Sequence, residues 1–298
     1  MFIWGTGHIG HMAYEELRKN NIPIEGFIDS FYKERHITIA QSSVRVYGTD
    51  ELQYINGDVL IAIFQYEEVV LKLVEYNNLN LIGIYVPDKG IVGYSESFQV
   101  VNNSQSGEEL YLRELFSNVK NGFFVDVGAL HPYRFSNTHW AYERGWKGIN
   151  IEPNPEMFKL FLKYRERDIN LNLGISNKAG MLNYYMYNEP AYNSFCKSDE
   201  RKPKNTISVL TKSLRDIFRE YDIRHIDFLS IDVEGSELSV LRSNDWDRWR
   251  PKWILVEQLE FDIDTYHQDE LYNFLKRAGY KFDSKYNRTV FYQEVNDI

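Results

Sequence analysis

Apolar runs and amphipathic stretches alternate along the first third of the chain. Phe2–Trp4 is apolar and leads into a glycine-rich turn, and residues 9–17 then place apolar side chains at the spacing of a helix. The same alternation predicts strands at 24–28, 44–46, 58–64 and 79–86 and helices at 51–55 and 67–77. Strands that alternate with helices indicate a parallel sheet with helices on both faces.

A second alternating series begins after residue 107. It predicts an amphipathic helix at 108–119 and strands at 123–128, 148–152, 169–173, 226–232 and 253–257. The last apolar runs, 281–282 and 289–293, predict an antiparallel hairpin that closes the sheet. Gly, Ser and Asn are frequent between the two series. We therefore expect a small Rossmann-like α/β domain at 1–90, a linker at 91–106 and a larger α/β domain at 107–298.

Composition and charge exclude several classes of protein. Lys plus Arg is 34 and Asp plus Glu is 43, a net charge of −9, so the chain lacks the basic excess that a nucleic-acid partner requires. Its single cysteine, Cys196, rules out internal disulfides and cysteine-rich zinc sites. The longest fully apolar run, 59–64, is far shorter than the roughly 20 residues that span a bilayer. With no signal-peptide pattern at its start, the chain is expected to be cytoplasmic; its oligomeric state stays open.

A glycine pattern marks the first predicted strand-to-helix turn. Gly5-x-Gly7-x-x-Gly10 follows a strand and opens a helix, the context in which such glycines let the backbone approach a phosphate. Asp29 ends the next predicted strand, where an acid could bind a ribose hydroxyl. These four residues predict a nucleotide site, with a purely structural lobe as the alternative.

Acidic residues also end strands of the second series. Asp126 precedes the turn at Gly128, and Glu152 ends the next strand, where its carboxylate could take two hydrogen bonds from a ribose diol. No glycine-rich phosphate cradle accompanies them, which argues against a dinucleotide. A cofactor with an adenosine ribose and a charged amino-acid tail fits the pattern.

Three further carboxylates, Asp232, Glu234 and Glu257, follow two other apolar strands. Carboxylates at neighbouring strand ends are costly to bury unless they bind a cation, share a proton or take part in chemistry. We expect one of them, or His131, to act as a general base. A divalent cation held by Asp232 and Glu257 is the less favoured alternative, because no histidine stands beside these strand ends in the sequence.

These stretches together resemble the FkbM family of S-adenosylmethionine-dependent methyltransferases, over roughly residues 107–298. The resemblance is carried by 125–129 (VDVGA), 148–153 (GINIEP), 231–237 (IDVEGSE) and 254–257 (ILVE). It implies a class I methyltransferase fold, a Rossmann-like and mostly parallel sheet with an antiparallel C-terminal hairpin, and O-methylation of sugars or natural products. The chain differs from many members at Leu130-His131-Pro132, where those members have Asn and then Gly.

The family resemblance also implies roles for individual residues. It places Asp126 and Gly128 near the methionine part of the cofactor, Glu152 on the ribose hydroxyls, and Ser176 and Asn177 beside the adenine. Ala129 and Asp232 are also expected to bind the cofactor. A looser resemblance links the N-terminal lobe to nucleotide-sugar-binding domains of sugar-modifying enzymes. Residues 131–138 are similar to a subset of the family found in surface-polysaccharide gene clusters.

The function expected first is methylation of a hydroxyl on a sugar or polysaccharide precursor, either free or nucleotide-linked. A tyrosine-rich stretch is expected to form the wall of the acceptor site: Tyr184, Tyr185, Tyr187 and Tyr192. Two alternatives stay open. One is a nicotinamide-dependent oxidoreductase acting on a nucleotide-sugar, built on the Gly5–Gly10 turn, and the other is a nucleotide-sugar-binding scaffold without catalytic activity.

Overall fold

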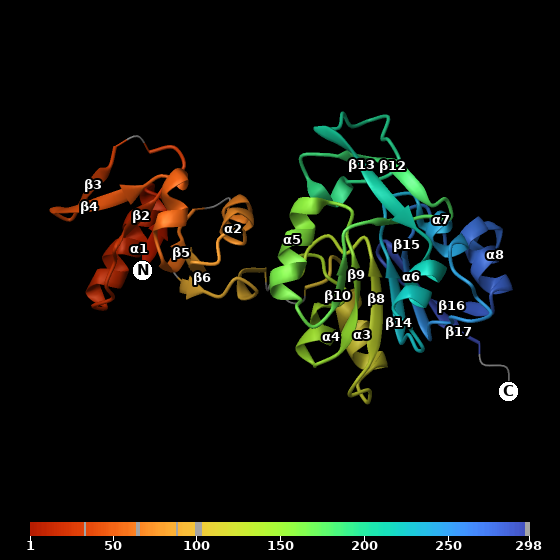
Figure 1. The fold of residues 1–298 in the computed structure, drawn as a ribbon. Coiled ribbons are helices and arrows are strands. Elements are labelled where there is room, and N and C mark those ends of the chain that lie inside the picture. The colour runs from red at the N-terminus through yellow and green to blue at the C-terminus, as the bar shows by residue number, and fades with distance from the viewer. Residues whose placement is uncertain (33, 64–65, 88, 99–102, 296–298) are drawn as a thin grey trace. The chain divides into compact units, whose positions relative to one another are not determined.

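The computed structural model describes residues 1–32, 34–63, 66–87, 89–98 and 103–295. The chain divides into two compact units, residues 1–99 and 100–298, each with its own seven-stranded sheet (Figure 1). Residues 99–102 of the predicted linker and residue 64 of a predicted strand lie outside the described residues. No helix in the described ranges is long and apolar enough to cross a membrane.

The N-terminal unit, red to orange in Figure 1, has the strand order β3-β4-β2-β1-β5-β6-β7. Its strands are β1 (Phe2–Trp4), β2 (Gly26–Ile28), β3 (His36–Ile39), β4 (Ser42–Tyr47), β5 (Gly57–Ile61), β6 (Leu79–Val86) and β7 (Gly90–Val92). Its helices are α1 (His8–Lys19) and α2 (Glu67–Leu73), with 3₁₀ turns η1 (Thr49–Tyr54) and η2 (Glu96–Phe98). Strand β7 and turn η2 occupy part of the stretch predicted as a linker.

Pairing in this sheet differs from the prediction at its edges. The five central strands pair in parallel, whereas β3 and β7 pair antiparallel with β4 and β6. The expected parallel sheet is therefore confirmed for the five central strands, and the two antiparallel edge strands make the sheet mixed. The connections to β3 and β7 are too short for the crossover that a parallel neighbour requires.

The C-terminal unit, yellow-green to blue, contains a sheet in the order β10-β9-β8-β14-β15-β17-β16. Its strands are β8 (Phe123–Val127), β9 (Lys147–Ile151), β10 (Ile169–Leu171), β14 (Phe228–Ile231), β15 (Trp253–Glu257), β16 (Tyr280–Tyr286) and β17 (Thr289–Glu294). Its helices are α3 (Glu108–Leu115), α4 (His139–Glu143), α5 (Pro155–Tyr164), α6 (Leu214–Glu220), α7 (Glu237–Arg242) and α8 (Glu270–Arg277), with a 3₁₀ turn η4 (Tyr266–Gln268). Strands β10, β9, β8, β14 and β15 pair in parallel, and β17 pairs antiparallel with both β15 and β16, so the predicted sheet with an antiparallel C-terminal hairpin is confirmed.

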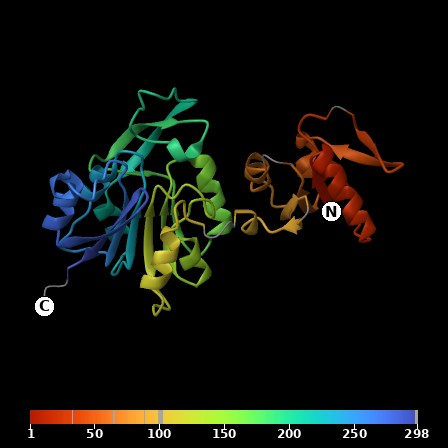
Figure 2. The ribbon, with the colours of Figure 1, turned by 180° about the vertical axis from the view of Figure 1, so that it is seen from behind.

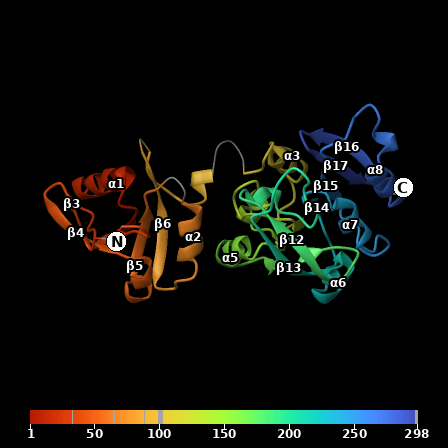
Figure 3. The same ribbon diagram turned by 90° about the horizontal axis from the view of Figure 1, so that it is seen from above.

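Two hydrophobic cores cover the two faces of this sheet, because successive side chains of a strand point to opposite faces. Val125 and Leu229 pack in the core beneath α6 and α8. Their chain neighbours Phe124 and Phe228 pack in the core beneath α3 and α4. Figure 3 shows α3 and α6 on opposite sides of the strands. Burial on both faces explains why these strands appear in the sequence as continuous apolar runs.

A smaller three-stranded sheet lies over one end of the larger one (Figures 1 and 2). It consists of β11 (Gly174–Ile175), β12 (Gly180–Met186) and β13 (Asn205–Lys212), in the order β11-β13-β12. β12 and β13 pair antiparallel over their whole length, and the 3₁₀ turn η3 (Pro190–Tyr192) lies in the segment that joins them. Neither strand was predicted from the sequence, because each mixes polar with apolar residues and forms no continuous apolar run.

Gly128 and Gly145 provide a matched pair for testing how closely the chain packs after β8. Both have a left-handed backbone, with φ of 80° and 88°, which costs a residue with a Cβ about 1–2 kcal/mol. A Cβ on Gly128 would also collide with the carbonyl oxygen of Asp232, whereas a Cβ on Gly145 would have no described atom within 4 Å beyond its own chain neighbours. We expect Gly145→Ala to lower the free energy of unfolding by about 1 kcal/mol and Gly128→Ala by roughly 1–3 kcal/mol more.

Urea unfolding followed by tryptophan fluorescence measures this difference, because every tryptophan except Trp4 lies in the C-terminal unit. Equal losses of stability in the two variants would contradict the close approach at Gly128.

Candidate active site

Six of the residues predicted for the site line one cavity of about 220 Å³ in the C-terminal unit. They are Asp126, Gly128, Ala129, Glu152, Asp232 and Glu234. The cavity lies at the carboxyl ends of β8, β9 and β14, and the segment from β12 to β13 contributes Tyr184 and Tyr192 to its wall. Tyr185 and Tyr187 of the predicted tyrosine-rich wall do not line it.

The register of the sheet explains why the predicted residues meet. One row of paired positions crosses four neighbouring parallel strands through Val127, Ile151, Ile231 and Val256. The next residues along these strands are Gly128, Glu152, Asp232 and Glu257. Parallel strands end at the same edge of a sheet, so the polar residues that follow them gather there.

Glu152 is a buried carboxylate that retains hydrogen-bonding capacity. Only 3% of the residue is exposed. One oxygen accepts a hydrogen bond from the backbone N–H of Leu130 and the other from that of Asn154, both at 2.7 Å. Burial raises its pKa to about 7, although these two donors act in the opposite direction. A carboxylate has about four acceptor positions, so about two remain for a ligand.

Asp126 is held by a buried polar network. Its carboxylate accepts a hydrogen bond from the Thr138 hydroxyl at 2.9 Å, and that hydroxyl accepts one from the Arg165 guanidinium at 3.1 Å. Arg165 is fully buried and pairs with Asp168 at 2.9 Å. Burial raises the pKa of Asp126 to about 6, while Thr138 and Arg165 favour its charged form.

Asn137 is a cavity residue that the sequence analysis did not identify. Its amide nitrogen donates to the Ser230 hydroxyl at 3.3 Å, and its Oδ1 is buried without a hydrogen-bond partner among the described residues. A buried acceptor without a donor is costly, so this atom suits a ligand that carries an N–H or O–H group. The signal in the sequence that could have identified Asn137 is its position in the segment that follows β8.

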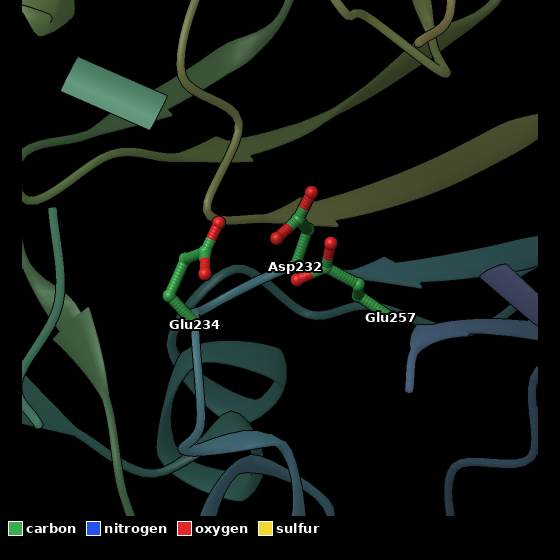
Figure 4. Close-up of side chains that lie close together, drawn as sticks. All are labelled: Asp232, Glu234 and Glu257. Atoms are coloured by element: carbon green, nitrogen blue, oxygen red, sulfur yellow. The ribbon is translucent and has the colours of Figure 1, made fainter. Parts of the chain in front are cut away.

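Asp232, Glu234 and Glu257 form a cluster of carboxylates (Figure 4). One oxygen of each lies within 4.8 Å of the others, and a hydrogen bond joins the carboxyl groups of Asp232 and Glu257. Burial and the neighbouring carboxylates raise the pKa of Asp232 well above its ordinary value. Because two negative charges this close repel each other, the geometry favours one proton shared by the Asp232–Glu257 pair. The same oxygens offer the hard ligands that a divalent cation prefers, so this alternative is retained.

Glu234 has a strained backbone and lies close to other carboxylates. Its backbone has a left-handed φ of 52° without being glycine, a conformation that is costly and concentrates at functional sites. Burial, followed by the charges of Glu257 and Glu237, raises its pKa to about 7.

Four residues predicted for this site do not line the cavity: His131, Ser176, Asn177 and Glu257, whose carboxyl group pairs with that of Asp232. The ring nitrogen Nδ1 of buried His131 accepts hydrogen bonds from two backbone amides of the loop that follows it, at 3.0 and 2.9 Å. Burial lowers the pKa of His131 to about 3, so the ring is neutral and stabilises the loop. Ser176 and Asn177 instead contact the Ser239 hydroxyl of α7, at 3.2 and 3.0 Å.

A second cavity, of about 170 Å³, lies in the N-terminal unit. Gly5 and Asp29 line it, together with residues that follow β5 and residues of α2, including Lys72. It stands at the carboxyl ends of β1, β2 and β5, where the strand order reverses direction, the usual place for ligands in open α/β sheets. Gly7 and Gly10 do not line it, and a Cβ on Gly10 would collide with the carbonyl oxygen of Gly5.

The Asp29 carboxylate accepts hydrogen bonds from the two loops beside it. One oxygen accepts hydrogen bonds from the backbone and hydroxyl of Thr6, at 2.9 and 2.6 Å, and the other from the amides of Phe31 and Tyr32. These four bonds occupy the acceptor positions of a carboxylate. Asp29 therefore holds the glycine-rich turn in place and has no position left for a ribose diol.

Distant similarity links the chain to solved methyltransferases. It is similar to 1,6-didemethyltoxoflavin-N1-methyltransferase of Burkholderia thailandensis, with bound 1,6-didemethyltoxoflavin and S-adenosylhomocysteine, at 12% identity and a TM-score of 0.33, over 63% of this chain and 77% of that one. Precorrin-6y C5,15-methyltransferase of Geobacter metallireducens GS-15 has 12% sequence identity and a TM-score of 0.33. The match covers 65% of this chain and 89% of that one. A SAM-dependent methyltransferase of Geobacter sulfurreducens, in complex with S-adenosylhomocysteine, has 14% sequence identity and a TM-score of 0.31. The match covers 64% of this chain and 70% of that one. No curated protein matches the chain.

The sheet order, with its antiparallel last hairpin and a cavity at the strand ends, defines a methyltransferase-like α/β protein. Residues 126–282, just over half of the chain, match the model of the methyltransferase FkbM domain. The chain therefore belongs to the FkbM methyltransferase family and is an S-adenosylmethionine-dependent methyltransferase. The expected family, enzyme class and cofactor are confirmed.

Burial of Asp126 makes stability depend on pH. Its pKa rises in the fold from an ordinary value of 3.8 to about 6. Between these values the folded chain holds more protons at this group than the unfolded chain, so its contribution to stability falls as the pH rises. Buried His131 and His139 act in the opposite direction, because their pKa values are lowered. The effect of Asp126 is therefore measured as a difference between variants.

We expect Asp126→Asn to gain stability relative to the wild type as the pH rises from about 4 to about 7, by up to roughly 2 kcal/mol. Thermal unfolding at a series of pH values measures this difference. Glu156→Gln, at an exposed position of α5, serves as the control and should show no such trend. A constant difference between Asp126→Asn and the wild type would contradict the raised pKa.

Proposed function

We propose that the C-terminal unit transfers the methyl group of S-adenosylmethionine to a hydroxyl of a sugar or glycan precursor. One observation carries the proposal: Glu152, a buried carboxylate with open acceptor positions, lies in the same cavity as Asp232, one of a pair of carboxyl groups that shares a proton. The first suits the binding of a diol and the second suits the acceptance of a proton.

Several cavity residues fit the cofactor. The open positions on Glu152 match the donors of the ribose hydroxyls. The partnerless Oδ1 of Asn137 and the carboxylate of Asp126 suit an ammonium group, such as that of the methionine tail. Gly128 and Ala129 bring backbone close to the same place. Ser176 and Asn177 would have to exchange their contacts with Ser239 to reach an adenine.

Asp232 is proposed as the general base. When bound, S-adenosylmethionine supplies a methyl group on a positively charged sulfur, which leaves as a neutral thioether once an oxygen takes the methyl carbon. A sugar hydroxyl is a weak nucleophile while it keeps its proton, so accepting that proton on the Asp232–Glu257 pair accelerates transfer by ~10²–10⁴-fold. Once the pair has lost its shared proton, the raised pKa of Asp232 makes its ionised form a stronger base than an ordinary carboxylate. Orientation of the acceptor in the cavity supplies a further ~7–11 kcal/mol.

The acceptor class is supported by the aromatic part of the cavity. Phe135, Tyr184 and Tyr192 line it, and aromatic rings offer flat apolar faces on which the C–H face of a sugar ring can pack. A role in polysaccharide biosynthesis and a cytoplasmic location stay predictions. Activation of the hydroxyl by a divalent cation on Asp232 and Glu257 stays the less favoured alternative.

We also propose that the N-terminal unit binds the nucleotide part of a nucleotide-linked acceptor. The cavity beside Gly5, at the reversal of strand order, supports this proposal. Asp29 would stabilise the glycine-rich turn there and would not contact the ribose.

Calorimetry on the full chain separates the proposed function from its alternatives. We expect S-adenosylhomocysteine to bind at one site and NAD not to bind. Glu152→Ala should lower the affinity for S-adenosylhomocysteine by about 30-fold or more, because two hydrogen bonds to a charged group are lost. Glu156→Ala should leave this affinity unchanged. Binding of NAD alone would favour the oxidoreductase, and binding of UDP-glucose alone would favour the scaffold.

The role of Asp232 is tested by Asp232→Asn. We expect transfer of a radiolabelled methyl group to glycan precursors to fall ~10²–10⁴-fold, with the affinity for S-adenosylhomocysteine within about threefold of wild type. Asp264→Asn, at an exposed position outside the cavity, is the matched control. Full turnover in Asp232→Asn would exclude this residue from the chemistry.

A further inference from the structure

Arg288 places a cation beside the proton-sharing pair. It lies in the turn between β16 and β17, lines the cavity, and has a side chain that is 46% exposed. Its backbone oxygen accepts a hydrogen bond from the amide of Gln258 at 2.7 Å, which fixes the turn beside the end of β15. In the described part of the chain, the carboxylate within 4 Å of its guanidinium is that of Glu257, at 3.9 Å.

This distance leaves the guanidinium of Arg288 open. A hydrogen bond from a guanidinium to a carboxylate measures about 2.7–2.9 Å, and the Arg288 side chain makes none to any residue that the structure describes. Arg134, which also lines the cavity, is by contrast bound to Glu189 at 2.8 Å. Arg288 therefore keeps its five N–H donors for a ligand.

The surroundings of Arg288 indicate what that ligand is. Asp126, Glu152, Asp232 and Glu234 also line the cavity, and the charge of Arg134 there is paired with Glu189. An anionic ligand would therefore be repelled unless it met the cation of Arg288. A planar guanidinium binds a carboxylate or phosphate through two parallel hydrogen bonds. Because Arg288 stands beside Glu257, an anion bound to it lies next to the place where the carboxyl pair meets a hydroxyl.

We propose that the acceptor is an anionic sugar, either a sugar acid or a sugar phosphate, and that Arg288 binds its negative group. This inference rests on the proposed function, since it takes the Asp232–Glu257 pair as the place of methyl transfer. It makes Arg288 a specificity-determining residue that separates charged acceptors from their neutral parents.

Nuclear magnetic resonance of the full chain, labelled with ¹⁵N-arginine and saturated with S-adenosylhomocysteine, tests the inference. The Nε–H resonance of Arg288 is assigned by its loss in Arg288→Gln. D-glucuronate, glucose 6-phosphate and D-glucose are then titrated. We expect at least one of the two acids to shift this resonance saturably and glucose not to shift it; the tighter acid shows whether carboxylate or phosphate is preferred.

Variants complete the test. Calorimetry should show that Arg288→Gln lowers the affinity for the preferred acid at least tenfold and that Arg288→Lys lowers it by less. Arg224→Gln, which removes an exposed arginine paired with Asp222 at 2.7 Å, should have no effect. Equal responses to glucose and both acids, or no response to either acid, would overturn the inference. If S-adenosylhomocysteine itself fails to bind, the proposed function fails; if it binds and no acid is preferred, only the inference fails.

Discussion

Burial of carboxylates at the ends of neighbouring parallel strands is the constraint on which this site depends. A charged carboxylate cannot be moved out of water without compensation, and each one here is compensated differently. Glu152 receives two backbone N–H groups, Asp126 receives the Thr138 hydroxyl, and buried Glu257 is paired with the half-buried Asp232. These differences give each carboxylate a distinct chemical capacity within one cavity.

The hydrogen-bond network that holds Asp126 extends to residues that do not line the cavity. Arg165 is among the largest fully buried side chains of the described chain, and it joins Asp168, Thr138 and the carbonyl oxygen of Pro132. This ties the loop after β8 to the end of α5. A buried network of this kind is costly when partly satisfied and rigid when complete, so it fixes the position of Asp126.

Much of this site followed from the sequence for a local reason. An apolar run that ends in a single acid identifies both a strand and its carboxyl end, and parallel pairing then brings Asp126, Glu152 and Asp232 together. The contributions of Asn137 and Arg288 could not be predicted in this way, because each depends on which segments fold over the strand ends.

Side-chain direction was equally inaccessible from the sequence. His131 follows Leu130, whose left-handed φ of 52° belongs to a loop in which the ring accepts backbone hydrogen bonds. Asp29 stands where a ribose-binding acid is expected, but it is taken up by Thr6 and by the turn that follows it. In both cases local backbone geometry, which the residue type does not reveal, decides what the side chain binds.

A crystal structure of the full chain with S-adenosylhomocysteine is the most direct test of the central claim, that the strand-end cavity holds the cofactor on Glu152 beside the Asp232–Glu257 pair. We expect both ribose hydroxyl oxygens within about 2.5–3.0 Å of the Glu152 carboxylate, with the sulfur facing the pair. A ligand bound elsewhere, or a ribose that leaves Glu152 uncontacted, would contradict it.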